Sequence, residues 1–175
     1  MTTIMSKERA ATSTRWTADP DETSVEFAVD TFWGLSTVRG RFDRFDGWYE
    51  VGPDGMNIEA TIDADSLDTG NRKRDDHLRS ADFFGADEHP QMRFTSTRVR
   101  RQGEAVLHVE GGLEAAGKVV PLEFDAWVEE VNGGLEIEAL TTVDPRQFGM
   151  SSGRLGMIRP PATLHVKARL VEETS

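Results

Sequence analysis

Residues 68–84 read DTGNRKRDDHLRSADFF and interrupt a chain that elsewhere alternates apolar and polar residues. Charged side chains crowd this segment until the paired aromatic residues Phe83 and Phe84 end it. Period-two alternation is typical of strands with one buried face, so its loss predicts a short helix between two groups of strands. We interpret the segment as the lid of a β-barrel, with its apolar residues sealing the barrel mouth.

The alternation on either side of this segment predicts about eight or nine strands. In the first of them, Val25, Phe27 and Val29 share one face. Glycine-rich turns at residues 52–55 and 132–133 separate some of the strands, and such short turns imply antiparallel neighbours. The predicted strands are residues 23–30, 37–42, 45–51 and 56–63 before the segment, and 91–100, 105–115, 119–130, 135–143 and 163–171 after it.

An antiparallel sheet of this length tends to curl or close, and closure removes exposed edges. We therefore expect an all-β fold, an antiparallel eight-stranded β-barrel with a short helical lid. A two-sheet sandwich remains the alternative, because alternation alone does not separate the two. Small residues at inward positions favour a barrel with room for one small ligand. These small inward residues are Ala60, Ser96, Ala126, Ala139 and Ala168.

Composition excludes several kinds of function. The chain has 20 basic and 31 acidic residues and a net charge of -11, which disfavours binding to nucleic acid and to anionic membranes. Cysteine is absent, which excludes disulfides, thiolate metal sites and a cysteine nucleophile. No segment approaches the roughly 20 apolar residues that span a bilayer, so stable membrane insertion is not expected.

The first residues, MTTIMSKERAATSTR, contain no apolar core of the kind found in a secretory signal. We therefore expect a cytoplasmic protein. Residues 1–15 are predicted to be a flexible tail, and residues 16–175 to form a single domain.

Three motifs resemble the YceI-like family. Residues 23–47, TSVEFAVDTFWGLSTVRGRFDRFDG, are similar to its first hairpin. Residues 67–97 match its longer pattern S-x-D-T-G-N-x-x-R-D-x-H-L-x-S-x-D-F-F, followed by P-x-x-x-F-x-S. Residues 144–150, DPRQFGM, resemble its R-x-x-F-G-M. The similarity covers residues 16–170, and the central motif is long enough to be specific.

The resemblance implies a lipocalin-like barrel that holds a polyisoprenoid chain, such as an isoprenoid lipid or a quinone tail. It implies a carrier or sequestering protein without catalysis and without a cofactor other than such a lipid. The chain departs from the family at residues 113–122, LEAAGKVVPL, where Ala116 stands in place of a frequent histidine.

The polar cluster in the lid has two interpretations. His77 beside Asp75 and Asp76 suggests a metal site, but residues two apart on a helix do not share a face. Asp75 and Arg79 do share a face, which predicts a surface ion pair. We therefore expect no metal, and we expect Arg74, Asp75 and His77 to form a clasp that fixes the lid.

The remaining histidines do not change this expectation. His89, His108 and His165 are expected to be exposed, and none has the spacing of metal ligands. No G-x-S-x-G elbow or glycine-rich phosphate loop is present either.

Inward strand positions, the lid and the apolar loop after residue 145 together define a predicted ligand pocket. Apolar residues in that loop could close one end of the barrel, which we favour, or could contribute to a homodimer contact. The predicted pocket residues are Phe27, Val29, Trp33, Phe42, Ile58, Leu78, Phe83, Phe94, Leu107, Phe124, Phe148 and Met150.

Two alternatives to a lipid carrier stay open from the sequence. One is an enzyme that acts on a bound prenyl or quinone substrate, and the other is a stress-related interaction domain with a filled core. Chemical turnover of the ligand would distinguish an enzyme from a carrier. An internal cavity would distinguish a carrier from an interaction domain with a filled core.

Overall fold

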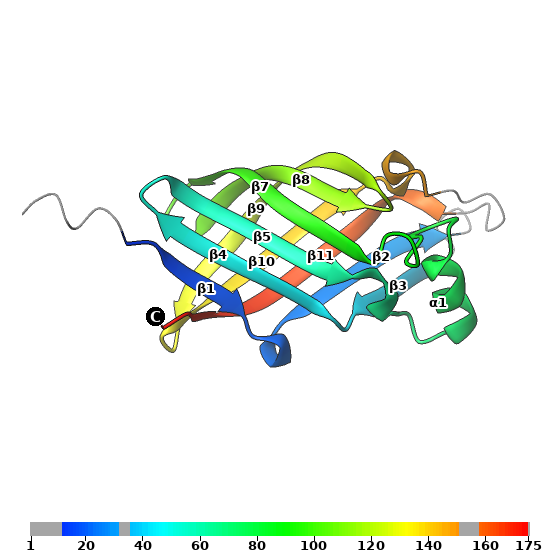
Figure 1. Cartoon of the computed structure of the whole chain (residues 1–175), viewed down its shortest axis with the longest axis horizontal. Helices are drawn as coiled ribbons and strands as arrows, with labels where there is room; N and C mark the ends of the chain where they lie inside the picture. The colour runs from blue at the N-terminus through cyan, green and yellow to red at the C-terminus, as the bar shows by residue number, and fades with distance from the viewer. Residues whose placement is uncertain (1–11, 32–35, 151–157, 175) are drawn as a thin grey trace, which may run out of the picture.

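The computed structural model describes residues 12–31, 36–150 and 158–174. Strands wind around a long axis to form a barrel, and α1, the one α-helix among the described residues, lies at one end of it (Figure 1). The strands are β1 Thr14–Ala18, β2 Ser24–Thr31, β3 Ser36–Phe42, β4 Phe45–Gly52, β5 Gly55–Asp63, β6 Leu67–Asp68, β7 Gln91–Arg101, β8 Val106–Ala115, β9 Lys118–Val131, β10 Gly134–Val143 and β11 Ile158–Glu172. The helices are α1 Arg72–Arg79 and the short 3-10 turns η1 Pro20–Glu22, η3 Ala64–Ser66 and η4 Pro145–Phe148.

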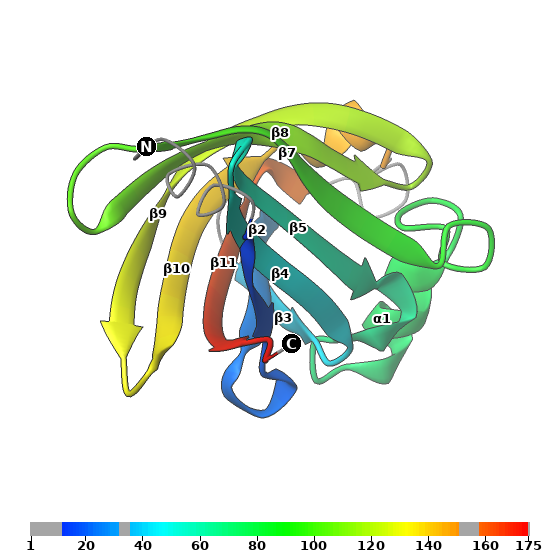
Figure 2. The ribbon, with the colours of Figure 1, turned by 60° about the vertical axis from the view of Figure 1, so that its left-hand side comes forward.

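Eight of these strands form a closed antiparallel ring in the order β1-β4-β5-β7-β8-β9-β10-β11, with β1 pairing back to β11. The view turned toward the end opposite α1 shows β1 lying between β4 and β11 (Figure 2). The predicted all-β barrel with a short helix is therefore confirmed. A sandwich of two separate sheets is excluded, because the ring has no break.

One edge of strand β11 pairs with two strands in succession, β1 and β2. Near its end it pairs with β1, through Trp16 opposite Glu172, and earlier it pairs with β2, through Val25 opposite Val166. Strand β2 also pairs with β3, and β3 in turn pairs with the two-residue strand β6 at Arg41 and Phe42. The barrel wall at the α1 end is thus extended by β2, β3 and β6.

The first and last strands of the barrel begin at other residues than the sequence predicted. Strand β1 begins at Thr14, so the last two residues of the predicted tail are already in the sheet. Strand β11 begins at Ile158, five residues before the start of the predicted strand at residue 163, and it includes Pro160 and Pro161. The register of β11 against β2 shifts between Arg159 and Ala162, and a bulge is one of the few places where a strand tolerates proline.

A bulge also shapes the β7–β8 hairpin. The register of β7 against β8 shifts between Ser96 and Arg98, next to Gly111 on β8, which pairs with Ser96. The Ser96 hydroxyl accepts a hydrogen bond from the backbone N–H of Ile58 at 2.9 Å. Gly111 is needed, since a Cβ there would lie 2.6 Å from the Phe94 ring.

The core follows from the alternation in the strands. Leu67, Leu107 and Val109 are almost completely buried and anchor a cluster of apolar side chains on the inner wall. Within the described residues, no helix has the length and apolar character to cross a bilayer.

Candidate ligand cavity

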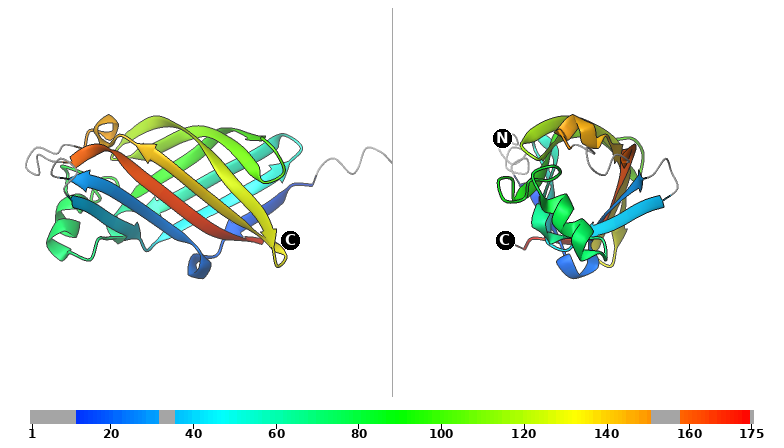
Figure 3. Two further views of the ribbon diagram at one scale, coloured as in Figure 1. Left: turned by 180° about the vertical axis from the view of Figure 1, so that it is seen from behind. Right: turned by 90° about the vertical axis from the view of Figure 1, so that its right-hand side faces the viewer.

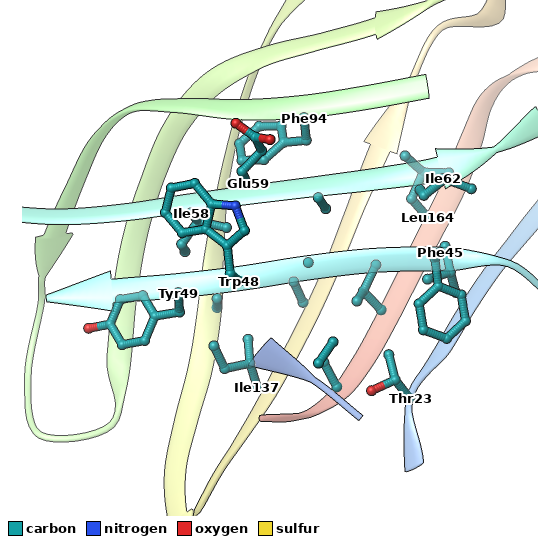
Figure 4. Close-up of a pocket in the computed structure, with 18 of the residues that line it drawn as sticks. Thr23, Phe45, Trp48, Tyr49, Ile58, Glu59, Ile62, Phe94, Ile137 and Leu164 are labelled. Atoms are coloured by element: carbon teal, nitrogen blue, oxygen red, sulfur yellow. The ribbon is translucent and has the colours of Figure 1, made fainter. Parts of the chain in front are cut away.

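The inner wall leaves an apolar cavity of about 170 Å³ in the middle of the barrel (Figure 4). Strands β4 and β5 contribute Phe45, Tyr49, Ile58 and Ile62, which alternate with outward residues such as Trp48. A cavity of roughly 150 Å³ lined by apolar groups is known to stay dry and to accept a benzene-sized molecule. This cavity can therefore hold one segment of an apolar ligand.

Small side chains create this space. Gly47 lies opposite Ala60 on the β4–β5 pair, and Ala126 lies opposite Ala139 on the β9–β10 pair. All four line the cavity, together with Ala168 of β11. Larger residues at these positions would fill the barrel, as they fill the centre of most eight-stranded barrels.

A second apolar cavity of about 130 Å³ lies toward the α1 end. Five residues line both cavities, so the two follow one another along the barrel. The shared residues are Val25, Ile62, Leu113, Leu164 and Val166. Together the cavities form an elongated apolar space that suits a chain-shaped ligand.

The end of the barrel remote from α1 is packed with aromatic rings. Trp16 of β1 stacks on Tyr49 of β4, with ring centroids 5.5 Å apart. Burial raises the pKa of the Tyr49 hydroxyl, and the charge of Arg101 opposes this effect. Tyr49 therefore stays neutral and forms part of the cavity's end wall.

The segment singled out in the sequence lies across part of the α1 end of the barrel (Figure 3, right). Leu78 of α1 and Phe83 and Phe84 beyond it line the second cavity. Phe84 contacts Phe42 of β3 edge to face, with ring centroids 5.8 Å apart. The apolar latch predicted for this segment thus lies over the second cavity.

Hydrogen bonds within the segment position α1. The Asn71 side chain accepts from the backbone N–H of Arg74 at 3.1 Å, which caps the helix. The buried Asp75 carboxylate accepts from the backbone N–H and the hydroxyl of Thr69, at 2.9 and 2.6 Å. Arg74 donates to the hydroxyl and carbonyl oxygens of Thr69, at 2.8 and 3.0 Å.

These contacts differ from the predicted ones in two respects. The predicted surface pair of Asp75 and Arg79 is not formed: Asp75 bonds Thr69, while Arg79 donates to the carbonyls of Asp65 and Leu67. His77 stands apart from Arg74 and Asp75, because its ring packs on Phe83 at 5.2 Å. Thr69 is the residue that links Arg74 to Asp75, and the sequence pattern did not single it out.

The predicted pocket residues fall into four groups. Ile58, Phe94 and Phe124 line the first cavity. Leu107 lines neither cavity and is buried in the wall packing, and Trp33 lies outside the described residues. Those that line the second cavity are Phe27, Val29, Phe42, Leu78, Phe83, Phe148 and Met150.

Sequence reasoning missed several lining residues that alternation could have given. Phe45 and Tyr49 share the inner face of β4, and Ile137 occupies the inner face of β10. Their strands were predicted, but the inward face of β4 was not assigned. Pro145 of the η4 turn also lines the second cavity, although no periodic pattern covers it.

Histidines on the outer wall pair with carboxylates. His108 contacts Asp125 at 2.8 Å and Glu123 at 2.9 Å, and His165 contacts Glu138 at 2.8 Å. His108 occupies the predicted outward position, but its neighbours cover it, so that its side chain is only 13% exposed. His89 is half-buried, since its ring packs over Gly117 in the β8–β9 turn. No group of these or other side chains in the described segments has the arrangement of a metal site.

Known proteins resemble this chain in both sequence and fold. The sequence profile of the YceI-like domain family matches residues 16–170. The chain belongs to the YceI-like domain family. A UPF0312 protein of Pectobacterium carotovorum is 38% identical over 105 residues, which make up 58% of this chain and 54% of that protein. A UPF0312 protein of Shewanella baltica is 32% identical over 159 residues, 86% of this chain and 80% of that one.

Matches to curated relatives such as the Pectobacterium protein cover only about half of the relative's length. Among solved structures, Burkholderia cenocepacia BcnA superposes with a TM-score of 0.79 at 18% identity, covering 90% of this chain and 99% of BcnA. A polyisoprenoid binding domain from Saccharophagus degradans superposes with a TM-score of 0.74 at 12% identity, covering 90% and 98% of the two chains. These structural similarities establish the YceI-like fold.

Proposed function

We propose that this YceI-like protein binds a polyisoprenoid or similar long apolar lipid inside its barrel and carries or sequesters it without catalysis. The observation that supports the proposal most directly is the pair of apolar cavities that share five lining residues. A chain-shaped ligand fits this arrangement better than a compact one does. The Saccharophagus domain, described as polyisoprenoid binding, has the same fold.

Burial of a hydrocarbon chain supplies the binding energy. Each Å² of apolar surface removed from water contributes roughly 25 cal/mol. Several hundred Å² are needed to exceed the cost of association, which is about 4–15 kcal/mol. A prenyl chain that occupies both cavities buries its surface against the apolar walls on all sides, so it can bind without a charged contact.

The interior offers little for acid–base catalysis. A general acid or base must reach the reacting group with a pKa near the working pH. Asp46 and Glu59 belong to the first cavity's wall, but strand alternation directs their side chains outward. The titratable side chain on the inner face of these strands is Tyr49, whose pKa is raised by burial. These features favour a carrier over an enzyme.

Native mass spectrometry of protein purified without detergent tests the proposal. We expect a bound adduct that is extracted by organic solvent and recovered unchanged after prolonged incubation with the protein. A mass that stays ligand-free after exposure to prenyl lipids would refute binding. Recovery of a chemically altered lipid would instead identify an enzyme.

A further inference from the structure

A polar cleft of about 330 Å³ lies outside the barrel, next to its α1 end. Phe83 and Phe148 line both this cleft and the second apolar cavity, and they are the only residues common to the two among those that the structure describes. Both rings are almost completely buried, 4% and 3% exposed. Two aromatic side chains therefore stand between the apolar interior and a polar compartment.

Lys118, at the start of β9, supplies an available donor in this cleft. Its ammonium group makes no hydrogen bond or ion pair with any described residue. It lies against the backbone of Gly149, where a Cβ would be 3.0 Å from Nζ. By contrast, Arg79 in the same cleft is engaged, since it bonds the carbonyls of Asp65 and Leu67 at 2.9 and 2.7 Å.

The other charged residues of the cleft are acidic. Asp87 and Glu88 are exposed, and neither forms an ion pair within the described residues. His89 is half-buried beside them, and its ring nitrogens make no hydrogen bond there. Within the cleft the two carboxylates offset the charges of Lys118 and Arg79, and the chain as a whole carries a net charge of -11. An anion therefore gains little there, whereas Lys118 and His89 can still donate to a neutral oxygen.

We propose that this cleft binds the head group of the lipid whose chain fills the barrel, and that the head group is a neutral hydrogen-bond acceptor such as a hydroxyl or carbonyl oxygen. The inference rests on the proposed lipid binding. The chain passes between Phe83 and Phe148, and Lys118 donates to the head-group oxygen. A diphosphate head group is disfavoured because Asp87 and Glu88 offset the charges of Lys118 and Arg79 in the same compartment, and the chain as a whole is acidic.

Three probes with the same prenyl chain separate the possibilities: geranylgeraniol, geranylgeranyl diphosphate and the corresponding hydrocarbon without a head group. Affinities are measured by displacement of a fluorescent apolar dye from wild type, from Lys118→Met and from Lys167→Met. Lys167 is a matched control, since it is an exposed lysine on the outer wall, in β11.

We expect wild type to bind the alcohol more tightly than the hydrocarbon or the diphosphate. Lys118→Met should weaken alcohol binding by about tenfold, the loss of one charge-assisted hydrogen bond, and leave hydrocarbon binding unchanged. Lys167→Met should behave as wild type does.

Other results would overturn the inference. Equal binding of alcohol and hydrocarbon in both wild type and Lys118→Met would refute a head-group site in the cleft while leaving lipid binding intact. Tightest binding of the diphosphate would refute the neutral head group. Failure of all three probes to bind would refute both the head-group site and the proposed function.

Discussion

The indole ring of Trp16 lies parallel to the phenol ring of Tyr49, with centroids 5.5 Å apart and planes inclined by 22°. The two residues are cross-strand partners on β1 and β4. Offset stacking of this kind contributes about 0.5–1.5 kcal/mol beyond the burial of the rings. The Tyr49 hydroxyl is buried, and it has no hydrogen-bond partner in the described part of the chain.

Tyr49→Phe should stabilise the protein or leave its stability unchanged. The substitution keeps the stack on Trp16 and removes a hydroxyl whose burial without a partner costs about 1–3 kcal/mol. Urea unfolding should show a midpoint at or above that of wild type. Trp16→Leu is the control, because it removes the stack and should lower the midpoint. A clear loss of stability in Tyr49→Phe would show that the hydroxyl has a partner.

Ala139→Phe should abolish lipid binding without unfolding the protein. Ala139 lines the first cavity from β10, so a phenyl ring there occupies the space proposed for the lipid chain. Native mass spectrometry after incubation with a prenyl lipid measures the bound fraction. Ala28→Phe is a matched control on β2, since Ala28 lies in a groove on the outer wall. Undiminished binding in Ala139→Phe would place the ligand elsewhere.

Asp75→Ala should loosen the lid. The buried carboxylate satisfies two donors of Thr69, and leaving them unpaired costs about 1–3 kcal/mol. Amide hydrogen exchange of α1 should become faster, while exchange in β8 and β9 should change little. Asp76→Ala is the comparison, because Asp76 is exposed and forms only a surface pair with Arg79, which contributes about 0–1 kcal/mol. Equal exchange of α1 in the two variants would contradict a structural role for Asp75.

The His108 site should make stability depend on pH. The hydrogen bond to Asp125 raises the pKa of His108, and the charges of Glu123 and Asp125 add to this effect. Partial burial of the ring opposes the shift, as does the charge of Arg100 to a smaller extent. Because the folded-state pKa lies above the unfolded value of about 6.5, the protonated form favours folding. The stabilisation is complete below about pH 6.5 and is lost as the pH rises through the folded-state pKa.

A comparison of His108→Gln with wild type measures this contribution. The difference in urea midpoint between the two should be larger at about pH 5.5 than at about pH 8.5. Asp125→Asn should lower the His108 pKa, which NMR titration reports directly, because it removes the largest cause of the shift. A His108 pKa that is unaffected by Asp125→Asn would contradict this assignment.

Much of the barrel could be predicted because one face of each long strand is buried. The alternation of Met56, Ile58, Ala60 and Ile62 gave β5 almost to its ends, and the Asn132–Gly133 turn placed the β9–β10 hairpin. Short strands carry too few periods for such a signal. Strands β1, with five residues, and β6, with two, were therefore missed.

The cavity was harder to predict than the wall. Inward positions follow from alternation, but whether their side chains fill the barrel depends on pairs across the interior. Leu107 and Phe124 were both expected in the pocket, yet Leu107 is buried in the wall and only Phe124 lines the cavity. The link between Arg74 and Asp75 through Thr69 also depends on where the chain turns before α1. Sequence spacing does not encode that turn.

The clasp around Thr69 joins groups only five and six residues apart, and β6 pairs with β3 at just two positions. Breaking these local contacts leaves every pairing of the eight-stranded ring intact, including the one that places Trp16 beside Tyr49. For the proposed lipid ligand, release past residues 68–84 would require only these local contacts to open, while the strand pairing of the ring stays intact. Substitutions in this segment should therefore change the release rate with little change in resistance to denaturation.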